Sequence, residues 1–435
     1  MFLPLTAEIV TIGDELNRGE ITDTNSAWIA ERLTRLGCHV RWRSSVVDDD
    51  ADMSAALAQA AKRARVVVVS GGLGPTEDDR TVDVACALLG VAPVEDALHR
   101  ERMDARFRER GFTVTPNNLR QVRVPSGAVV LTNDAGLAPG FSVRLGQAEI
   151  FFTPGVPREM KAIFDTGIAP RVSALLEGAP ATARRVWRVS GMGESHVAHR
   201  LRGVMDGIDD ATLHFRIAYP ENLVTVVARR ASQADADAVI NQLDIRMRER
   251  LGGAVYGIND ETLPLLIGRA LTARRETIAT AESCTGGLIG DLLTDVAGSS
   301  AYFLGGVIAY SNDVKRAQLG VSEATLAAHG AVSAECVREM AAGVRARLGT
   351  TWGVAVSGIA GPDGGSPDKP VGLVHFAVAG PSGIEARQLS WKAERRQVKE
   401  LAAHAALNLL HRLLDEKRAA MPEPIEAAAR SGKRS

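Results

Sequence analysis

The apolar residues near the start of the chain alternate between two spacings. Residues 7–13 and 66–70 read as buried strands, and the second is a continuous β-branched run of the kind that helices cover on both faces in a parallel sheet. Between them, residues 28–36 place apolar side chains at helical spacing, and residues 39–47 read as another strand. This alternation predicts a doubly wound α/β domain, which we assign to residues 1–171.

The pattern changes from about residue 172. Residues 184–190 and two alternating runs that follow read as strands, and residues 232–251 read as a helix. A unit of this size that mixes strands with helices predicts a small α+β domain, residues 172–256. Its Gly191-Met-Gly-Glu turn has no basic cluster around it, so we do not interpret it as an RNA-binding loop.

The last third returns to alternating strands and helices. Residues 277–282 read as a strand that enters a glycine-rich turn and then a helix, and residues 352–357 read as a strand that enters a long glycine-rich loop. We predict a second α/β domain over residues 257–416, closed by a long helix. Residues 417–435, rich in Ala, Pro, Glu, Lys and Arg, are predicted to be disordered.

Composition agrees with several soluble domains and narrows the class of partner. A chain of 435 residues with 46% hydrophobic and 24% charged residues is long enough for about three cores. The 51 basic and 52 acidic residues give no electrostatic reason to expect nucleic acid. The four cysteines lack CxxC spacing, which disfavours a zinc site or a disulfide framework, and no apolar run suits a membrane span. We therefore expect a cytoplasmic protein that binds small molecules.

A glycine-rich loop follows the third predicted strand and favours phosphate binding. Glycines at such a strand end let the backbone approach phosphate oxygens while the next helix supplies N–H donors. The residues of this loop are Gly71, Gly72, Gly74, Pro75 and Thr76. Asp78 and Asp79, with Asp14 and Glu15 after the first strand, offer hard oxygen ligands for a Mg²⁺-like ion. The alternative is that Asp78 and Asp79 only favour a helix N-terminus.

The turn from Thr280 to Gly287 is the second candidate site. Ser283 stands where a strand gives way to a helix, and Lys315 and Tyr310 follow another predicted strand end. Amide hydrolysis needs a nucleophile, a base and donors for the oxyanion, and a lysine serves as base when burial lowers its pKa. The alternatives are a capped turn, a solvated lysine and a core tyrosine. Cys284 is the rival nucleophile, ranked below Ser283 because no histidine lies beside it in sequence.

The motifs of the first domain are similar to a known fold. Residues 71–79 and 153–160, with Ile12-Gly-Asp-Glu and Asp23-Thr-Asn25, resemble the MoaB/MogA-type molybdopterin-binding fold as it occurs in the CinA family. The resemblance implies nucleotide contacts that include Asn25 and Gly155, and cleavage of the ADP-ribose pyrophosphate with Mg, Mn or Co. The family usually has a second leucine where this chain has Asn17, and the alternative is a non-catalytic molybdopterin- or nucleotide-binding or scaffolding module.

The rest of the chain extends the resemblance to the same family. The middle domain is similar to its KH-like insert. Residues 280–287, 309–315, 330–333 and 357–365 are similar to its C-terminal domain, the nicotinamide-nucleotide amidohydrolases. This implies a homodimer that deamidates nicotinamide mononucleotide without a cofactor, with Ser283 as nucleophile, Lys315 as base and Tyr310 as its hydrogen-bonding assistant. The residues implied in substrate binding are Glu282, Cys284, Thr285, Gly286, Gly287, Gly358, Ile359, Ala360 and Gly361.

Overall fold

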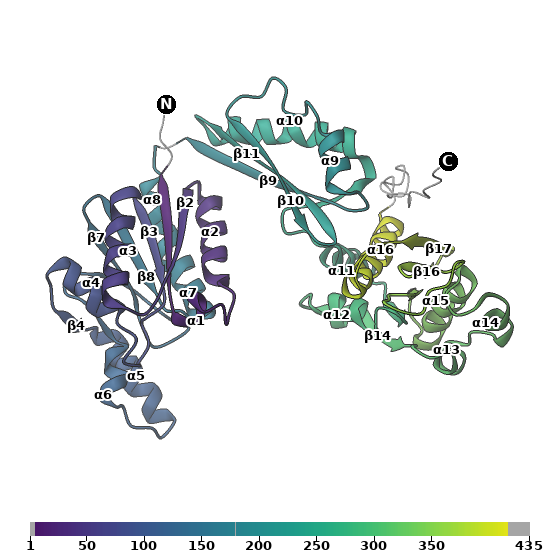
Figure 1. Cartoon of the computed structure of the whole chain (residues 1–435), viewed down its shortest axis with the longest axis horizontal. Helices are drawn as coiled ribbons and strands as arrows, with labels where there is room; N and C mark the ends of the chain where they lie inside the picture. The colour runs from purple at the N-terminus through teal and green to yellow at the C-terminus, as the bar shows by residue number, and fades with distance from the viewer. Residues whose placement is uncertain (1–4, 179, 416–435) are drawn as a thin grey trace. The chain divides into compact units, whose positions relative to one another are not determined.

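The computed structural model describes residues 5–178 and 180–415, so the tail predicted to be disordered lies outside the described residues. The chain divides into two compact units. Met1–Thr182 and Arg229–Ala236 form the first, and Ala183–Ala228 and Asp237–Ser435 form the second. Figure 1 labels their helices and strands.

The first unit is built on a six-stranded sheet in the order β2-β1-β3-β8-β7-β6. Strands β2, β1, β3 and β8 are parallel neighbours, and β7 and β6 continue the sheet in antiparallel pairs. The strands are β1 (Thr6–Ile12), β2 (His39–Val46), β3 (Val66–Ser70), β6 (Val129–Leu131), β7 (Gly140–Leu145) and β8 (Ala148–Thr153). The sheet is therefore mixed, with its parallel part in the segment that the sequence predicts.

Helices cover both faces of this sheet, as the doubly wound prediction requires. One core contains Met53 and Leu57 of α3 (Asp50–Arg63) and residues of α4 (Thr81–Leu89). The other contains Ile29 of α2 (Thr24–Leu36) and residues of α7, η1 and α8. The remaining helices are α1 (Asp14–Asn17), α7 (Pro157–Ile163), η1 (Phe164–Ile168) and α8 (Ala169–Leu175). The α/β fold of this unit is confirmed.

Local signals set the limits of these helices. The Asp23 carboxylate accepts a hydrogen bond from the Ser26 N–H at the start of α2, and Gly37 ends the helix in a left-handed conformation with φ 106°. A small extension holds a two-stranded sheet and two further helices. These are β4 (Pro93–Glu95), β5 (Arg123–Pro125), α5 (Ala97–Glu109) and α6 (Pro116–Arg120).

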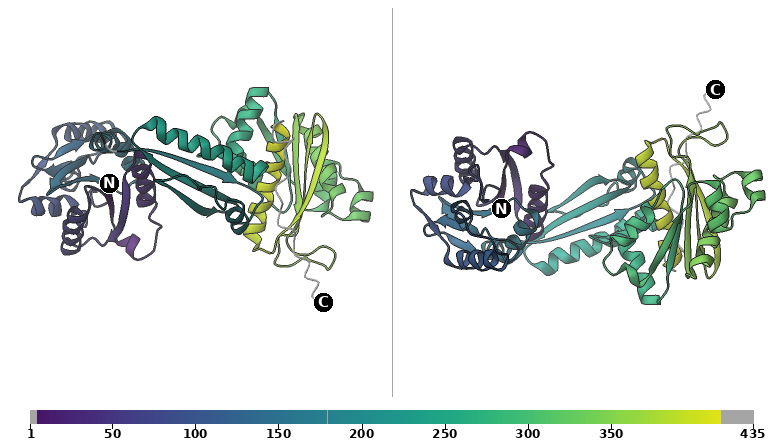
Figure 2. Two further views of the ribbon diagram at one scale, coloured as in Figure 1. Left: turned by 90° about the horizontal axis from the view of Figure 1, so that it is seen from above. Right: turned by 90° about the horizontal axis from the view of Figure 1, so that it is seen from below.

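The middle domain is an α+β module with one more strand than predicted. Its sheet has the order β10-β11-β9-β12, and Figure 2 shows the long helix α10 lying along it. The elements are β9 (Ala181–Val189), α9 (Glu194–Arg200), β10 (Ala211–Ala218), β11 (Glu221–Arg230), α10 (Gln233–Leu251), η2 (Gly252–Ala254) and β12 (Val255–Ile258). Gly252 and Gly253, which follow α10, therefore lead into a strand that pairs with β9.

The C-terminal domain has a five-stranded sheet in the order β14-β13-β15-β16-β17. Strands β14, β13 and β15 are parallel, whereas β16 and β17 are added in antiparallel pairs. The strands are β13 (Ile278–Glu282), β14 (Phe303–Ile308), β15 (Trp352–Gly358), β16 (Leu373–Gly380) and β17 (Gly383–Ser390). The carboxyl ends of the three parallel strands meet at one edge, where the predicted site lies.

Helices again pack on two sides of the sheet. One core contains Leu271 of α11 and Leu407 of α16, and the other contains Met340 of α15. The helices are α11 (Leu263–Arg274), α12 (Leu288–Thr294), η3 (Ser299–Ala301), α13 (Asn312–Leu319), α14 (Glu323–His329), α15 (Ala334–Leu348) and α16 (Arg395–Leu414).

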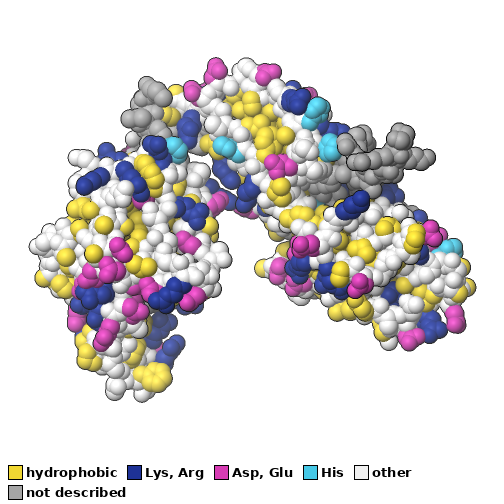
Figure 3. Space-filling model, viewed as in Figure 1, with side chains coloured by type: hydrophobic (Ala, Val, Ile, Leu, Met, Phe, Trp, Pro, Cys, Tyr) yellow, Lys and Arg dark blue, Asp and Glu magenta, His cyan; other side chains and the backbone are white. Residues whose placement is uncertain are grey.

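The limit of the first domain, the charges on the surface and the length of the helices can each be compared with the expectations from the sequence. Val172 is fully buried in a core of the first unit, so the N-terminal domain continues through α8, beyond the predicted limit at residue 171. On the face shown in Figure 3, Lys and Arg side chains are interspersed with Asp and Glu. Within the described residues, every helix is too short or too polar to cross a lipid bilayer.

Candidate active site

The strand register brings three segments of the C-terminal domain together at Ser283. Glu282, the last residue of β13, is paired with Ile308 of β14 and Val356 of β15. The chain therefore continues into Ser283 between the two neighbouring strand ends. The Ser283 N–H donates to the Val356 carbonyl at 3.0 Å, which fixes the start of the turn. Backbone pairing thus places the predicted nucleophile beside the segment that carries the predicted base.

Lys315 is buried next to Ser283. Its side chain is 1% exposed, and its Nζ lies 3.1 Å from the Ser283 Oγ, 2.7 Å from the Ala309 carbonyl oxygen and 3.3 Å from the Tyr310 carbonyl oxygen. The lysine is held there because Ser311 caps the first turn of α13. The side chains predicted as nucleophile and base are therefore within hydrogen-bond distance of each other.

The contacts of Lys315 suit a neutral amine. A neutral amine has two N–H bonds and one lone pair. The carbonyls of Ala309 and Tyr310 can take the two hydrogens, which leaves the lone pair for the hydroxyl proton of Ser283. Burial lowers the pKa of Lys315 from 10.5, and the thiols of Cys336 and Cys284 offset this only in part. Lys315 can therefore act as a general base.

Cys284 is a poor nucleophile in this environment. Its side chain is 6% exposed, and burial raises the pKa of its thiol to about 12. The thiolate is the reactive form of cysteine, so a thiol that stays protonated at neutral pH is inert. The structure favours Ser283 over Cys284 as the group that attacks.

The turn after Ser283 is closed by the carboxylate of Glu282. Glu282 is 1% exposed, and its carboxylate accepts hydrogen bonds from the N–H groups of Gly287 at 3.0 Å, Ile289 at 3.0 Å and Gly290 at 2.9 Å. The N-terminus of α12 is thus occupied by a carboxylate from its own chain. These three N–H groups are not available for a substrate anion, and Glu282 caps its own helix in this structure.

Tyr310 contacts Lys315 through its backbone and Arg395 through its side chain. Its backbone carbonyl contacts Lys315, but its side chain is 64% exposed and its hydroxyl accepts a hydrogen bond from Arg395 Nη2 at 3.3 Å. The second terminal nitrogen, Arg395 Nη1, donates to the Gly361 carbonyl at 2.7 Å. In this structure the Tyr310 phenol contacts Arg395, and the role of Tyr310 as assistant to Lys315 stays a prediction.

A cavity of about 270 Å³ opens onto these groups. Of the predicted residues, those that line it are Ser283, Cys284, Tyr310, Lys315, Gly358, Ile359, Ala360 and Gly361. The predicted contacts that do not line it are Glu282, Thr285, Gly286 and Gly287. The other lining residues are Asn312, Ala331, Val332, Ser357, Asp363 and Gly364, which lie in the motif segments 309–315, 330–333 and 357–365, and Arg395, which the sequence analysis missed.

The glycine-rich loop after β15 is tied down on the opposite side of the cavity. Gly361 has φ +82°, and a Cβ there would lie 2.6 Å from a methyl group of Val371, so a side chain would not fit. The Ser357 hydroxyl donates to the Ala331 carbonyl at 2.7 Å, and the Lys369 ammonium donates to the His329 carbonyl. These contacts join the loop to the end of α14 and to the segment that follows it.

The predicted nucleotide-binding residues of the first unit also meet at strand ends. Asn25 Nδ2 donates to the Ser70 hydroxyl at 3.0 Å and to the Gly155 carbonyl at 2.7 Å. Gly71 has φ +124°, and a Cβ there would lie 2.2 Å from the Ile12 carbonyl oxygen. Three turns that are far apart in sequence are therefore packed against one another.

The two predicted metal-binding aspartates behave differently. The Asp79 carboxylate accepts hydrogen bonds from the N–H of Gly74 at 2.7 Å, the N–H of Thr76 at 2.9 Å and the Thr76 hydroxyl. It closes its own loop through groups that precede α4, which differs both from the predicted metal role and from the alternative of a helix N-terminal role. The Asp78 carboxylate also interacts with Thr76, which lowers the pKa of Asp78, and it lies near Asp48, whose ionisation it disfavours.

Asp48 belongs to an acidic group that sequence reasoning missed. Its carboxylate accepts a hydrogen bond from the Asp14 N–H at 3.0 Å. Burial raises the pKa of Asp48, and the nearby charges of Asp14, Asp78 and Glu15 raise it further, although the Asp14 hydrogen bond lowers it. Within the described residues, no three His, Cys, Asp or Glu side chains are arranged to hold one metal ion. The carboxylate oxygens of Asp14, Glu15, Asp48 and Asp78 are of the chemical type that divalent cations prefer, although no three of them converge on one point here, and the Asp79 carboxylate is taken up by its own loop.

Three family models match the chain in the order of its domains. The probable molybdopterin binding domain matches residues 8–174, the damage-inducible protein CinA KH domain matches residues 184–257, and the CinA C-terminal domain matches residues 260–414. A CinA-like protein of Anaeromyxobacter sp. (strain Fw109-5) is 45% identical over 413 residues, which cover 94% of this chain and 99% of that protein. The chain belongs to the CinA family.

Two further CinA relatives match the chain over different lengths. A putative competence-damage inducible protein of Symbiobacterium thermophilum is 42% identical over 422 residues, covering 94% of this chain and 99% of its own. The crystal structure of the competence/damage inducible protein CihA from Agrobacterium tumefaciens is 40% identical, covers 35% of this chain and 96% of that chain, and has a TM-score of 0.34. The CinA resemblance inferred from the motifs and the three-part fold are confirmed.

Proposed function

We propose that the C-terminal domain hydrolyses nicotinamide mononucleotide to nicotinate mononucleotide and ammonia. The observation that carries the proposal is the 3.1 Å contact between the Ser283 hydroxyl and the buried amine of Lys315. A serine activated by a neutral lysine suits attack on a carboxamide, whose nitrogen must then leave as ammonia. Membership of the CinA family, with a matching C-terminal domain, supports the same reaction class.

Lys315 accepts and returns the proton in both halves of the reaction. The Ser283 Oγ attacks the carboxamide carbon while Lys315 takes the hydroxyl proton. When the carbon–nitrogen bond breaks, Lys315 returns that proton to the nitrogen, ammonia leaves, and an acyl ester remains on Ser283. Water then attacks the ester, with Lys315 accepting a proton from the water and giving it to the Ser283 oxygen. Atoms and charges balance without a cofactor, and we propose that this site uses none.

The charges of the cavity suggest how the nucleotide is oriented. Among its described lining residues, Lys315 and Arg395 are the two cationic side chains. Lys315 is committed to the carboxamide end, so we assign the 5′-phosphate to Arg395, whose guanidinium can bind phosphate oxygens through paired hydrogen bonds. Because Glu282 fills the N-terminus of α12, we place the oxyanion against the loop of residues 358–364.

Ammonia release from nicotinamide mononucleotide tests this proposal. We expect Ser283→Ala to lower kcat/KM by about a thousandfold or more, because the covalent step is lost. Cys284→Ala, at the adjacent position, is the matched control and should keep most of the activity. Undiminished activity in Ser283→Ala would overturn the proposal, as would complete loss of activity in EDTA.

A second experiment separates the two ends of the substrate. Arg395→Gln should raise KM for nicotinamide mononucleotide by about tenfold or more, since a charge-assisted phosphate contact is lost. The same variant should process nicotinamide riboside, which has no phosphate, as well as the unaltered protein does. Equal losses on both substrates would remove the phosphate assignment while leaving the roles of Ser283 and Lys315 intact.

The acidic group of the first unit favours a second candidate function, the metal-dependent hydrolysis of the ADP-ribose pyrophosphate. Its carboxylates lie beside the strand ends joined by Asn25, Gly71 and Gly155. A divalent ion held by Asp14, Glu15, Asp48 and Asp78 would neutralise pyrophosphate oxygens. Asp78→Asn should abolish hydrolysis with Mg²⁺, Mn²⁺ or Co²⁺, and Asp79→Asn is the comparison for loop damage. Binding of ADP-ribose or a pterin without turnover would favour the non-catalytic alternative.

A further inference from the structure

A second cavity in the second unit has no part in the reaction proposed above. It has a volume of about 570 Å³, within the usual range for small-molecule sites. Four segments line it, namely the turn 190–194 after β9, the β10–β11 hairpin at 217–222, the end of β17 at 388–391, and α16. All of these residues belong to one compact unit. The cavity therefore joins the KH-like module to the C-terminal domain.

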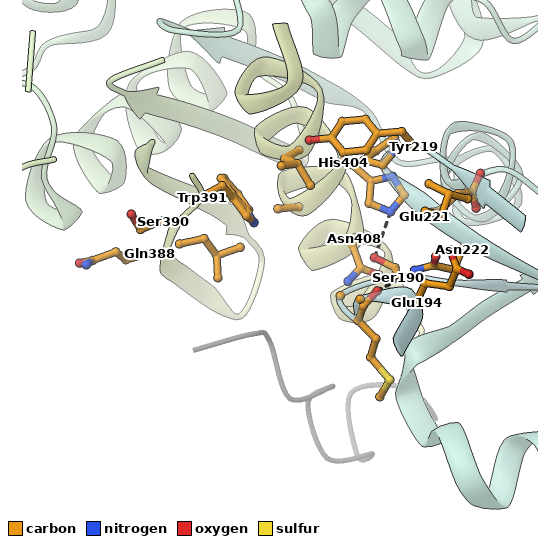
Figure 4. A pocket seen from close by; sticks show the side chains of 18 residues that line it. Ser190, Glu194, Tyr219, Glu221, Asn222, Gln388, Ser390, Trp391, His404 and Asn408 are labelled. Carbon is orange, nitrogen blue, oxygen red and sulfur yellow. Dashed lines mark hydrogen bonds between the residues drawn. The ribbon is translucent and has the colours of Figure 1, made fainter. Parts of the chain in front are cut away.

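Figure 4 shows how the polar side chains are distributed around this cavity. Ser190, Glu194, Glu221 and Asn222 come from the KH-like module, and Gln388, Ser390 and Trp391 come from the β17 segment. His404 and Asn408 project from α16 between these two groups. Ser190 is 3% exposed, and its hydroxyl lies 3.0 Å from His404 Nε2. The cavity thus has hydrogen-bonding groups on several sides.

Some of these polar groups are held in fixed positions. Asn222 is 8% exposed, and its Nδ2 donates to the Met192 carbonyl at 2.6 Å. The Tyr219 hydroxyl donates to the Gln397 carbonyl at 3.1 Å, and the Tyr256 ring meets the His404 ring edge-on with centroids 5.9 Å apart. A site whose side chains are already oriented loses less conformational entropy when a ligand binds.

The rest of the lining suits a flat, uncharged ring. Trp391 and Tyr219 supply aromatic surface, and the aliphatic and thioether side chains that accompany them are Met192, Ile217, Leu389 and Leu401. Heteroaromatic bases gain binding energy by stacking on such side chains, and amides such as those of Asn and Gln can pair with their polar edges. The combination of aromatic surface, amides and hydroxyls matches a base that carries a sugar.

Charge distinguishes this cavity from the candidate active site. The described residues that line it include Glu194 and Glu221 and no lysine or arginine. Glu221 is paired with Arg188 at 2.5 Å, whereas Glu194 is exposed at the rim. A phosphate here would meet carboxylates without a cation among the described lining residues, in contrast to the cavity that holds Lys315 and Arg395. We propose that this cavity binds a nucleoside without a phosphate group.

Calorimetric titration of the full chain tests this proposal. The probes are adenosine, guanosine, cytidine and uridine, each compared with its 5′-monophosphate. We expect at least one nucleoside to bind with a Kd below about 1 mM and its monophosphate to bind at least about tenfold more weakly at this site. Trp391→Ala should lower the affinity for that nucleoside by about tenfold or more, because a stacking surface is removed. Trp42→Ala, in the first unit, is the matched control and should leave the affinity unchanged.

A charge reversal provides an independent test. Glu194→Lys replaces an exposed rim carboxylate with a cation, so it should reduce or reverse the preference for the nucleoside over its monophosphate. Monophosphate binding that survives Trp391→Ala belongs to another site and is subtracted. Three results would overturn the proposal: no nucleoside binding at 5 mM (about five times the expected limit), equal binding of nucleoside and monophosphate at the Trp391-dependent site, or an unchanged preference in Glu194→Lys.

Discussion

Replacement of Glu282 by glutamine tests the account of the turn that carries Ser283. The carboxylate accepts three backbone hydrogen bonds in a buried position. Glutamine keeps one acceptor oxygen but replaces the other with an NH₂ group, which donates and therefore opposes the remaining N–H groups. At least one charge-assisted hydrogen bond is lost, at a cost of about 1.5 to 3 kcal/mol.

Hydrogen–deuterium exchange measures this loss where it occurs. A loss of about 1.5 to 3 kcal/mol corresponds to roughly 10- to 150-fold faster exchange, if the amides of Gly287, Ile289 and Gly290 exchange through local opening. Deamidation should also slow, with kcat falling because Ser283 is less firmly placed. Glu323→Gln makes the same chemical change at an exposed first-turn position of α14 and should alter neither quantity.

The two outcomes of Glu282→Gln separate two accounts of the helix terminus. If α12 used its N-terminus to bind the substrate phosphate, removal of the carboxylate would lower KM, because a repulsive charge would be gone. Unchanged exchange at these amides together with a lower KM would refute the assignment of Glu282 as an internal cap.

Three further predictions concern titratable groups. Burial lowers the pKa of Lys315 from 10.5. The value of kcat/KM should therefore rise as the pH rises through that lowered pKa, because the amine loses its proton and can act as a base. Lys315→Met should abolish the activity, and with it this dependence of kcat/KM on pH. The pKa of Asp48 is raised in the folded state, so its ionisation destabilises the fold, and Asp48→Asn should raise the Tm of the first unit by about 1 to 2 °C at pH 7. That gain should disappear in calorimetry as the pH falls below the ordinary aspartate pKa of 3.8, and a gain that persists there would have another cause. The high pKa of Cys284 predicts that iodoacetamide at pH 7 leaves deamidation unchanged, and rapid inactivation that is absent in Cys284→Ala would contradict this.

Much of the fold follows from local patterns in the sequence. Buried β-branched runs, capped helices and strand-end glycines give the alternating order of both α/β domains. The proximity of Ser283 and Lys315 could be predicted because parallel strands end at the same edge of a sheet. Strand β12 was missed because four residues, Val255–Ile258, follow a glycine pair and carry too little periodicity to separate them from a linker.

The parts of the site that could not be predicted depend on side-chain direction and distant segments. Nothing in the local sequence shows that Glu282 turns back toward α12 or that the Tyr310 phenol points away from Lys315. Arg395 reaches the cavity from a helix 85 positions beyond Tyr310, and Asp48 joins Asp14 from the end of a neighbouring strand 34 positions later. Such groupings arise from tertiary packing, which sequence spacing does not encode.

Helix α16 has a consequence for communication within the second unit. It carries Arg395 at its first residue and His404 and Asn408 two to four turns later, so one rigid element borders both cavities. A small rotation or translation of this helix would move residues that line both cavities. A ligand that displaced this helix in one cavity would therefore also alter the lining of the other.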